Sequence, residues 1–212
     1  PEAICNYLAL LGWSPGDDRE NIKMAELCEM FTVDKVHSSP ARFDMKKLEA
    51  INGDKIRALT LDEFLKWSLP FLTSAGVITG TDSEIALVKQ ALPLIQERIV
   101  KLDEVPAMLR FLFVKNFAVE EASLSKVTDS ASKDVLKRTL AELTPLATWN
   151  HDSIEVVLRT SLIEEMGLKP RIAFGAVRIA TTGSTISPPL FESMELLGKE
   201  SSLARIAAAI DL

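Results

Sequence analysis

The side chains best suited to chemistry lie near the end of the sequence, in RIATTGSTISPPL, which begins at Arg178 and ends at Leu190. Hydroxyl groups that can donate and accept hydrogen bonds are dense here: Thr181, Thr182, Ser184, Thr185 and Ser187. Gly183 permits a tight turn. A cation beside neutral hydroxyls is suited to binding a polar ligand. The same residues also fit an ordinary turn between two helices with N-capping hydroxyls, and composition leaves both interpretations open.

The charge distribution supports a ligand-binding turn more than the net charge does. The formal net charge is -6, which by itself argues against a nucleic-acid binder with a basic face. Residues 166–191, however, contain no carboxylate and three cations: Lys169, Arg171 and Arg178. An anionic ligand would meet little repulsion along this stretch.

Signatures of catalysis are missing from the sequence. There is no GxxxxGK[ST] or GxGxxG phosphate loop, no HExxH and no GxSxG. His37 has no acid placed to complete a triad, and Cys5 and Cys28 lie in helical patterns that predict buried free thiols. We therefore predict no catalytic residue and no metal site, and the cysteines favour a reducing, cytosolic compartment.

Helix signals dominate, and sustained alternation of apolar and polar residues is absent. Thr60 with Glu63 and Thr81 with Glu84 form capping boxes, and Asp44 and Asp103 are further N-cap candidates. Gly53 is expected to break the helix that Asp44 begins, and Pro188 and Pro189 suit the first turn of the penultimate helix. The sequence predicts an all-α fold.

The chain is long enough for two helical units. After Phe117 the residues become small and polar, with few large apolar side chains. We place a boundary there, which gives two helical subdomains, residues 1–115 and 116–212.

Three blocks resemble a known family. PEAICNYLALLGWSPGDD at the start, SSPARFDMKKLEAINGDKIR in the first third and ATTGSTISPPLFESMELLGKE near the end are similar to bacterial glutamyl-tRNA synthetases, in family order. The resemblance covers the whole chain, more weakly from about Ala118 to Gly167. One departure is Pro189, where the family usually has glycine, so that any RNA contact of that amide is lost.

The resemblance implies the C-terminal half of a class I aminoacyl-tRNA synthetase. The catalytic domain, with its ATP and Mg²⁺, would precede Pro1, so we expect no cofactor here and no aminoacylation by this chain alone. Residues 1–115 would form a stem-contact bundle and the first anticodon-binding subdomain, and residues 116–212 the C-terminal anticodon-binding subdomain. The implied partner is tRNA(Glu), bound by a cytoplasmic monomer without membrane or DNA. The alternative is a helical protein–protein interaction scaffold that binds no RNA.

The family's functional positions fall on identifiable residues. Arg178 and Leu190 match positions that contact anticodon bases, and Arg98 matches an arginine that helps separate the glutamate anticodon from the glutamine one at the third base. The further RNA-binding candidates are Lys101 as a competitor of Arg98, Arg110, Lys55, Arg57, Thr181, Thr182, Ser184, Ser187 and Pro188. Unpaired bases are read through hydrogen bonds to their edges and by stacking, which the neutral turn could provide.

Overall fold

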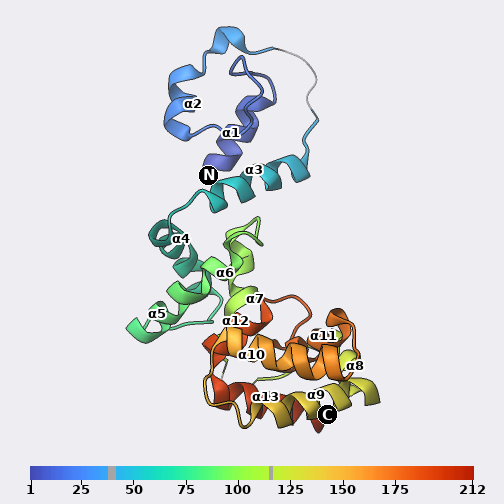
Figure 1. Ribbon diagram of the computed structural model, residues 1–212. Helices are drawn as coiled ribbons and strands as arrows, with labels where there is room; N and C mark the ends of the chain where they lie inside the picture. The colour runs from blue at the N-terminus through green and yellow to red at the C-terminus, as the bar shows by residue number, and fades with distance from the viewer. Residues whose placement is uncertain (38–41, 115–116) are drawn as a thin grey trace.

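The computed structural model describes residues 1–37, 42–114 and 117–212, and within these ranges it contains helices and no strand (Figure 1). The all-α prediction is confirmed. In chain order the α-helices are α1 (Glu2–Leu10), α2 (Met24–Met30), α3 (Met45–Arg57), α4 (Leu61–Ser74), α5 (Asp82–Ala91), α6 (Pro93–Gln96), α7 (Val105–Leu109), α8 (Glu121–Thr128), α9 (Ser130–Leu143), α10 (His151–Leu158), α11 (Pro170–Thr182), α12 (Leu190–Leu197) and α13 (Lys199–Ile210). Helix α10 continues directly into a π-helix, η4 (Arg159–Glu165). None of the described helices combines the length and apolarity needed to cross a bilayer.

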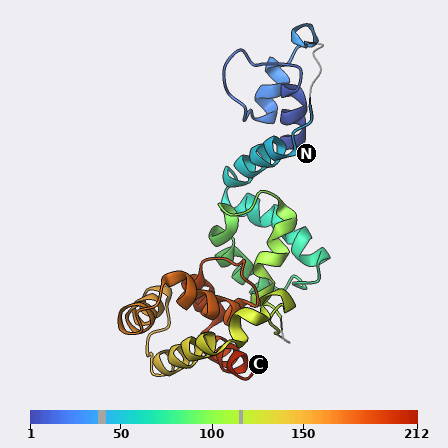
Figure 2. The same ribbon diagram turned by 90° about the vertical axis from the view of Figure 1, so that its right-hand side faces the viewer.

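The helices form three groups along an elongated molecule (Figures 1 and 2). Helices α1–α3 occupy one end, α4–α7 the middle and α8–α13 the other end. The apolar cores lie around Tyr7 and Trp13, around Phe64 and around Leu158, and the middle core also includes Ile56 of α3 and packs against Leu196 of α12. The middle core extends to Phe113, next to the boundary that the sequence suggests, and residues 1–115 hold two of the three groups.

Local capping signals set several helix starts as expected. The Asp44 carboxylate accepts the backbone N–H groups of Lys46 and Lys47 at the start of α3. Both predicted capping boxes are present, at the starts of α4 and α5. The backbone N–H of Thr81 is the main cause that lowers the pKa of Glu84 to about 2. These caps satisfy helix N–H groups that have no partner within the helix.

Two helix boundaries differ from the prediction. Helix α3 continues through Gly53, where an added Cβ would lie 3.2 Å from the Val100 side chain and from the Arg57 guanidinium, so the helix is closely packed at this position. Glycine costs a helix about 1 kcal/mol relative to alanine, and α3 tolerates that penalty. Asp103 lies in a short 3-10 turn, Leu102–Glu104, and α7 begins after it at Val105 without a side-chain cap.

The prediction of buried thiols is wrong. Cys5 and Cys28 are both free and exposed. They line an apolar cavity of about 550 Å³ together with Leu8 and Phe31, between α1 and α2. The apolar pattern of α1 is continuous around the helix, and its buried residues are Ala3, Asn6 and Tyr7. The sequence therefore does not indicate which face of α1 packs into the core.

Candidate functional site

The hydroxyl-rich stretch forms a bend between α11 and α12, which we call the elbow (residues 183–189). Helix α11 ends at Gly183, whose φ of 85° is left-handed, and the Gly183 N–H donates to the Ile179 carbonyl at 2.8 Å. Glycine is the residue that enters this conformation without strain. Pro188 and Pro189 were expected in the first turn of α12. Both precede this helix, which begins at Leu190, so that expectation is wrong.

The elbow is fixed against the segment that precedes α8. The Glu120 N–H donates to the Gly183 carbonyl at 2.9 Å. A Cβ at Gly183 would lie 3.0 Å from the Ala118 carbonyl oxygen and 3.3 Å from the Phe117 ring. The start of the C-terminal helix group is therefore in close contact with the elbow.

Arg178 holds the two sides of the elbow together. Its Nη1 donates to the Ser187 hydroxyl at 2.6 Å and to the Pro188 carbonyl at 2.7 Å. The side chain is half-buried. Burial is the main cause that lowers the pKa of Arg178, the nearby Arg98 charge lowers it further, and Glu192 opposes both.

The charge of Arg98 acts on the pKa of Arg178, although the two residues belong to different helix groups. Arg98 is exposed and follows α6 at the end of the middle group, and its charge is near enough to act on the Arg178 pKa. Within the part of the chain that the structure describes, neither guanidinium has a carboxylate within 4.0 Å. Two neighbouring like charges without such a partner favour the binding of an anionic or strongly accepting ligand.

Most hydroxyls at the end of α11 and in the elbow bond inside the protein. Thr181 is completely buried and donates to the Val177 carbonyl at 2.8 Å, and Thr182 donates to the Arg178 carbonyl at 2.8 Å. Ser187 is also buried, and its hydroxyl accepts a hydrogen bond from Arg178. In this arrangement Thr181, Thr182 and Ser187 shape the elbow and do not present their hydroxyls to a ligand, in contrast to the expectation from sequence.

The rest of the elbow divides between surface and core. Ser184 is half-buried and its hydroxyl accepts the Ile186 N–H at 3.3 Å, whereas Thr185 and Ile186 are exposed. Pro188 and Leu190 are buried. Contact of Leu190 with a base would therefore require movement of the elbow or use of the small part of its side chain that remains accessible.

The other predicted cations are placed elsewhere. Lys55 and Arg57 lie on α3, away from α11 and α12 in both views (Figures 1 and 2). Lys55 donates to the Ile22 carbonyl at 2.9 Å, and Arg57 pairs with Asp54 on its own helix.

The two remaining candidates differ in their partners. Lys101 pairs with Glu49 at 3.6 Å, whereas Arg98 has no ion-pair partner among the described residues, which makes Arg98 the better candidate of the two. Arg110 is exposed at the end of α7.

Arg205 on α13 was not identified from the sequence. It donates to the Thr181 carbonyl and to the Phe111 carbonyl, both at 2.8 Å, and its guanidinium stacks over the Phe117 ring at 3.9 Å. Burial lowers the pKa of Arg205 to about 10. Arg205 thus connects the end of α11 to the middle helix group and helps to fix Arg178 relative to Arg98. An arginine in an alanine-rich helix gives no local signal of this role.

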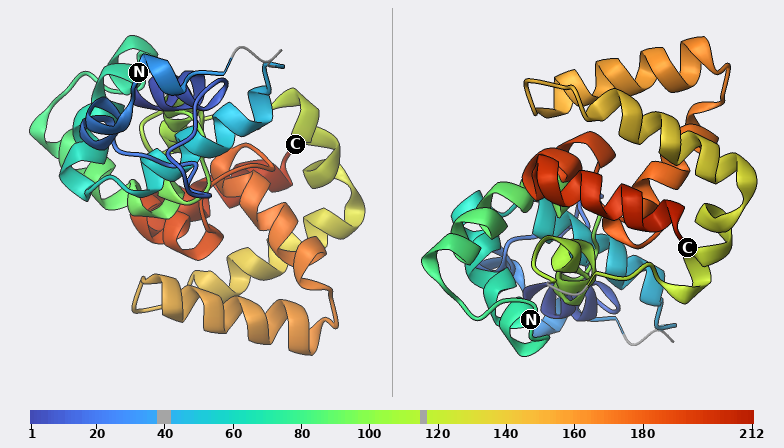
Figure 3. Two further views of the ribbon diagram at one scale, coloured as in Figure 1. Left: turned by 90° about the horizontal axis from the view of Figure 1, so that it is seen from above. Right: turned by 90° about the horizontal axis from the view of Figure 1, so that it is seen from below.

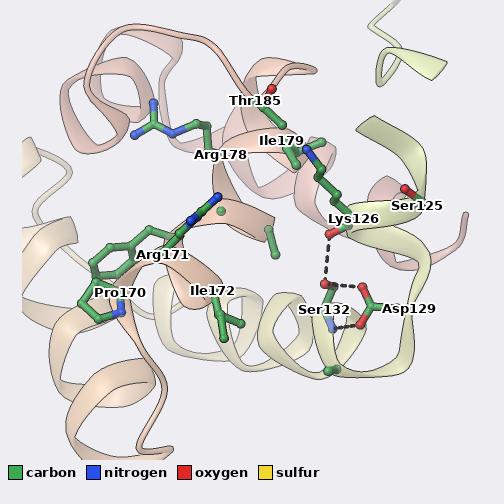
Figure 4. A pocket seen from close by; sticks show the side chains of 14 residues that line it. Ser125, Lys126, Asp129, Ser132, Pro170, Arg171, Ile172, Arg178, Ile179 and Thr185 are labelled. Atoms are coloured by element: carbon green, nitrogen blue, oxygen red, sulfur yellow. Dashed lines mark hydrogen bonds between the residues drawn. The ribbon is translucent and has the colours of Figure 1, made fainter. Parts of the chain in front are cut away.

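A cavity of about 820 Å³ opens beside Arg178, between α8 and α9 on one side and α11 on the other (Figure 4). Its charged lining residues are Lys126, Asp129, Arg171 and Arg178. The carboxylate-free stretch of the sequence includes Arg171 and so marks it as a candidate ligand-binding cation. Lys126 lies in a segment of mixed charge, and no sequence pattern marks it as a binding residue.

Comparisons with known proteins agree with this architecture. The family described as "Anticodon binding domain" matches residues 23–210. The chain is 45% identical over 213 residues to a glutamate–tRNA ligase of Saccharopolyspora erythraea and 46% identical over 214 residues to one of Nocardioides sp., each over 99% of this chain. It spans 42% and 44% of those relatives, which is less than half of their length.

Solved structures show the same fold. A glutamate tRNA ligase of Elizabethkingia meningosepticum in complex with its amino acid superposes with a TM-score of 0.80 at 24% identity, over all of this chain and 41% of that one. Glutamate-tRNA synthetase of Elizabethkingia anophelis gives a TM-score of 0.77 at 25% identity, also over all of this chain and 41% of that one. The resemblance to glutamyl-tRNA synthetases is confirmed, and the chain belongs to the anticodon-binding domain family.

Proposed function

We propose that this chain binds the anticodon loop of tRNA(Glu) as part of a glutamate–tRNA ligase. The observation that carries the proposal is the guanidinium of Arg178, which Ser187 and Pro188 hold at the elbow and whose pKa is lowered in part by the charge of Arg98 in the middle helix group. A guanidinium offers a planar fork of N–H donors that suits the acceptor edges of bases and phosphate oxygens. Anticodon bases are unpaired and can reach such a site when they unstack.

The division of roles follows the structure. Arg178 is held by Ser187 and Pro188, so its guanidinium is positioned before a ligand arrives. Arg98 is exposed and free to move toward a base. A preorganised cation and an adaptable one are together suited to reading adjacent bases.

The whole ligase would have its chemistry outside this chain. The relatives extend well beyond the region matched here, and we place ATP and Mg²⁺ in that remaining part. We further propose that the protein acts as a cytoplasmic monomer. The alternative is a scaffold that binds only proteins. It would give no role to the positive charges of Arg98 and Arg178.

Binding of an RNA hairpin tests the proposal. The 212-residue chain is titrated with the anticodon stem-loop of tRNA(Glu) and with the same hairpin after its anticodon bases are permuted, at several salt concentrations. We expect the permuted hairpin to bind at least about tenfold more weakly, because each lost base contact is worth roughly 1–3 kcal/mol. Affinity for both should fall with salt. Equal affinity for the two loops, or no RNA binding, would instead favour the protein scaffold.

A further inference from the structure

The cavity between α8, α9 and α11, here called the α8–α11 groove, has a positive lining. Lys126 comes from α8, and Arg171 and Arg178 come from α11 (Figure 4). Arg171 and Arg178 are seven residues apart, so they lie on the same face of the helix, two turns or roughly 10 Å from one another. The groove thus offers cations on both of its walls.

The charge of the groove is largely uncompensated. Asp129 is the carboxylate in its lining, and its two oxygens accept the Ser132 N–H at 3.0 Å and the Ser132 hydroxyl at 2.7 Å (Figure 4). That carboxylate caps α9. Among the residues that the structure describes, Lys126 and Arg171 have no carboxylate within 4.0 Å. Lys126 and Arg171 therefore accompany one carboxylate that already has partners, while the guanidinium of Arg178 is bonded to the elbow.

The position of the groove also favours an anion. Helix α11 begins at Pro170, which lines the groove, so the N–H groups of its first turn add partial positive charge nearby. Ser125 and Thr185 contribute hydroxyls to the lining, whereas the Ser132 hydroxyl already donates to Asp129 and to the Lys126 carbonyl. These groups match the oxygens of a phosphodiester.

The lining suits an RNA backbone better than a stacked base. Phe174 is the aromatic residue in the lining, and its ring already packs edge-on against Phe191, with centroids 5.3 Å apart, and lies beneath Arg159. A base entering the groove would find no free aromatic face on which to stack. Cations and hydroxyls remain, and these bind phosphate.

We propose that the α8–α11 groove holds the phosphodiester backbone of the RNA strand adjacent to the bases read at Arg178, with Lys126 and Arg171 contacting phosphate oxygens. The inference rests on the proposed anticodon-loop binding. Arg178 joins the two sites, because its side chain lines the groove while its guanidinium binds the elbow. Backbone contacts of this kind set the register of the strand without reading its sequence.

The test compares Lys126→Ala and Arg171→Ala with Lys137→Ala in the 212-residue chain. Lys137 is an exposed lysine on α9 that does not line the groove, so its replacement removes the same charge elsewhere. Affinities for the tRNA(Glu) hairpin and for the permuted hairpin are measured over a salt series. Each groove variant should weaken both hairpins by the same factor, about fivefold at low salt, and lower the slope of log affinity against log salt by about 0.7–1. Lys137→Ala should leave both quantities unchanged, and Lys126→Arg should restore them.

Different failures have different meanings. Wild-type affinity and salt slope in both groove variants would overturn the groove inference and leave anticodon reading intact. Binding of inorganic phosphate that disappears in the variants, without a change in hairpin affinity, would assign the groove to a free phosphate ligand and also overturn it. No hairpin binding by the unaltered chain would overturn both the groove inference and the proposed function. Circular dichroism of each variant checks that the helices are retained.

Discussion

Replacement of Arg178 by alanine is expected to weaken binding of the tRNA(Glu) hairpin by a factor of about 5 to 150. That range corresponds to roughly 1–3 kcal/mol for a bidentate contact between a guanidinium and a base. Arg178 is the best placed cation for such a contact, because its guanidinium is half-buried, held in position and without a carboxylate within 4.0 Å among the described residues. The loss should be larger for the tRNA(Glu) hairpin than for the permuted hairpin, since base reading is removed along with charge.

The same replacement should also loosen the elbow. It removes the guanidinium donor of the Pro188 carbonyl, which keeps the Ser187 hydroxyl as a donor, and the loss of a hydrogen bond to a charged group costs about 1.5–3 kcal/mol of folding free energy. Ser187→Ala separates the two effects, because it removes the two hydrogen bonds of the Ser187 hydroxyl and keeps the guanidinium. We expect Ser187→Ala to lower stability toward urea and to retain most of the hairpin affinity. If Arg178→Ala bound the hairpin as tightly as the unaltered chain, Arg178 would not be a base-reading residue.

Gly183→Ala is expected to destabilise the chain by about 2–5 kcal/mol. The φ of 85° at Gly183 is left-handed, which costs an L-residue roughly 1–2 kcal/mol. The added Cβ would also approach the Ala118 carbonyl oxygen to 3.0 Å, so the segment before α8 would have to shift. Steric crowding in a packed region typically costs a further 1–3 kcal/mol, approximately.

Gly175→Ala is the matched control for this change. Gly175 lies within α11, the helix that Gly183 terminates, has no positive φ, and an added Cβ would meet nothing within 4 Å. Alanine there should be neutral or stabilise the chain by up to about 1 kcal/mol, because glycine is a poor helix former. The free energy of unfolding in urea measures both variants. If Gly183→Ala and Gly175→Ala had similar free energies of unfolding, the contact between the elbow and residues 117–120 would not contribute to stability.

The sequence predicted those parts of the fold that depend on neighbouring residues. The capping boxes at Thr60 and Thr81 and the cap at Asp44 were correct, because each is built from residues within one helical turn. The all-α class follows from the same local signals. Gly53 was misjudged because its effect depends on Val100, which is distant in sequence.

The site was predictable only in part, for a related reason. Composition identified the elbow, and the family resemblance pointed to Arg98 and Arg178. Neither composition nor the resemblance indicated that the hydroxyls of Thr181 and Thr182 donate to carbonyls of the preceding helical turn. Threonine hydroxyls within helices commonly form such hydrogen bonds. Lys126 and Arg205 gain their positions from packing between α8, α11 and α13, and no local pattern marks them (Figure 3).

The central claim is that Arg98 and Arg178 form one base-reading site, and discrimination at the third anticodon base tests it most directly. Two hairpins that differ only at that base, one with the glutamate and one with the glutamine anticodon, are titrated against the unaltered chain and against Arg98→Gln. We predict that the unaltered chain prefers the glutamate hairpin and that Arg98→Gln reduces the ratio of the two affinities by about tenfold. An identical ratio in both proteins would contradict the claim.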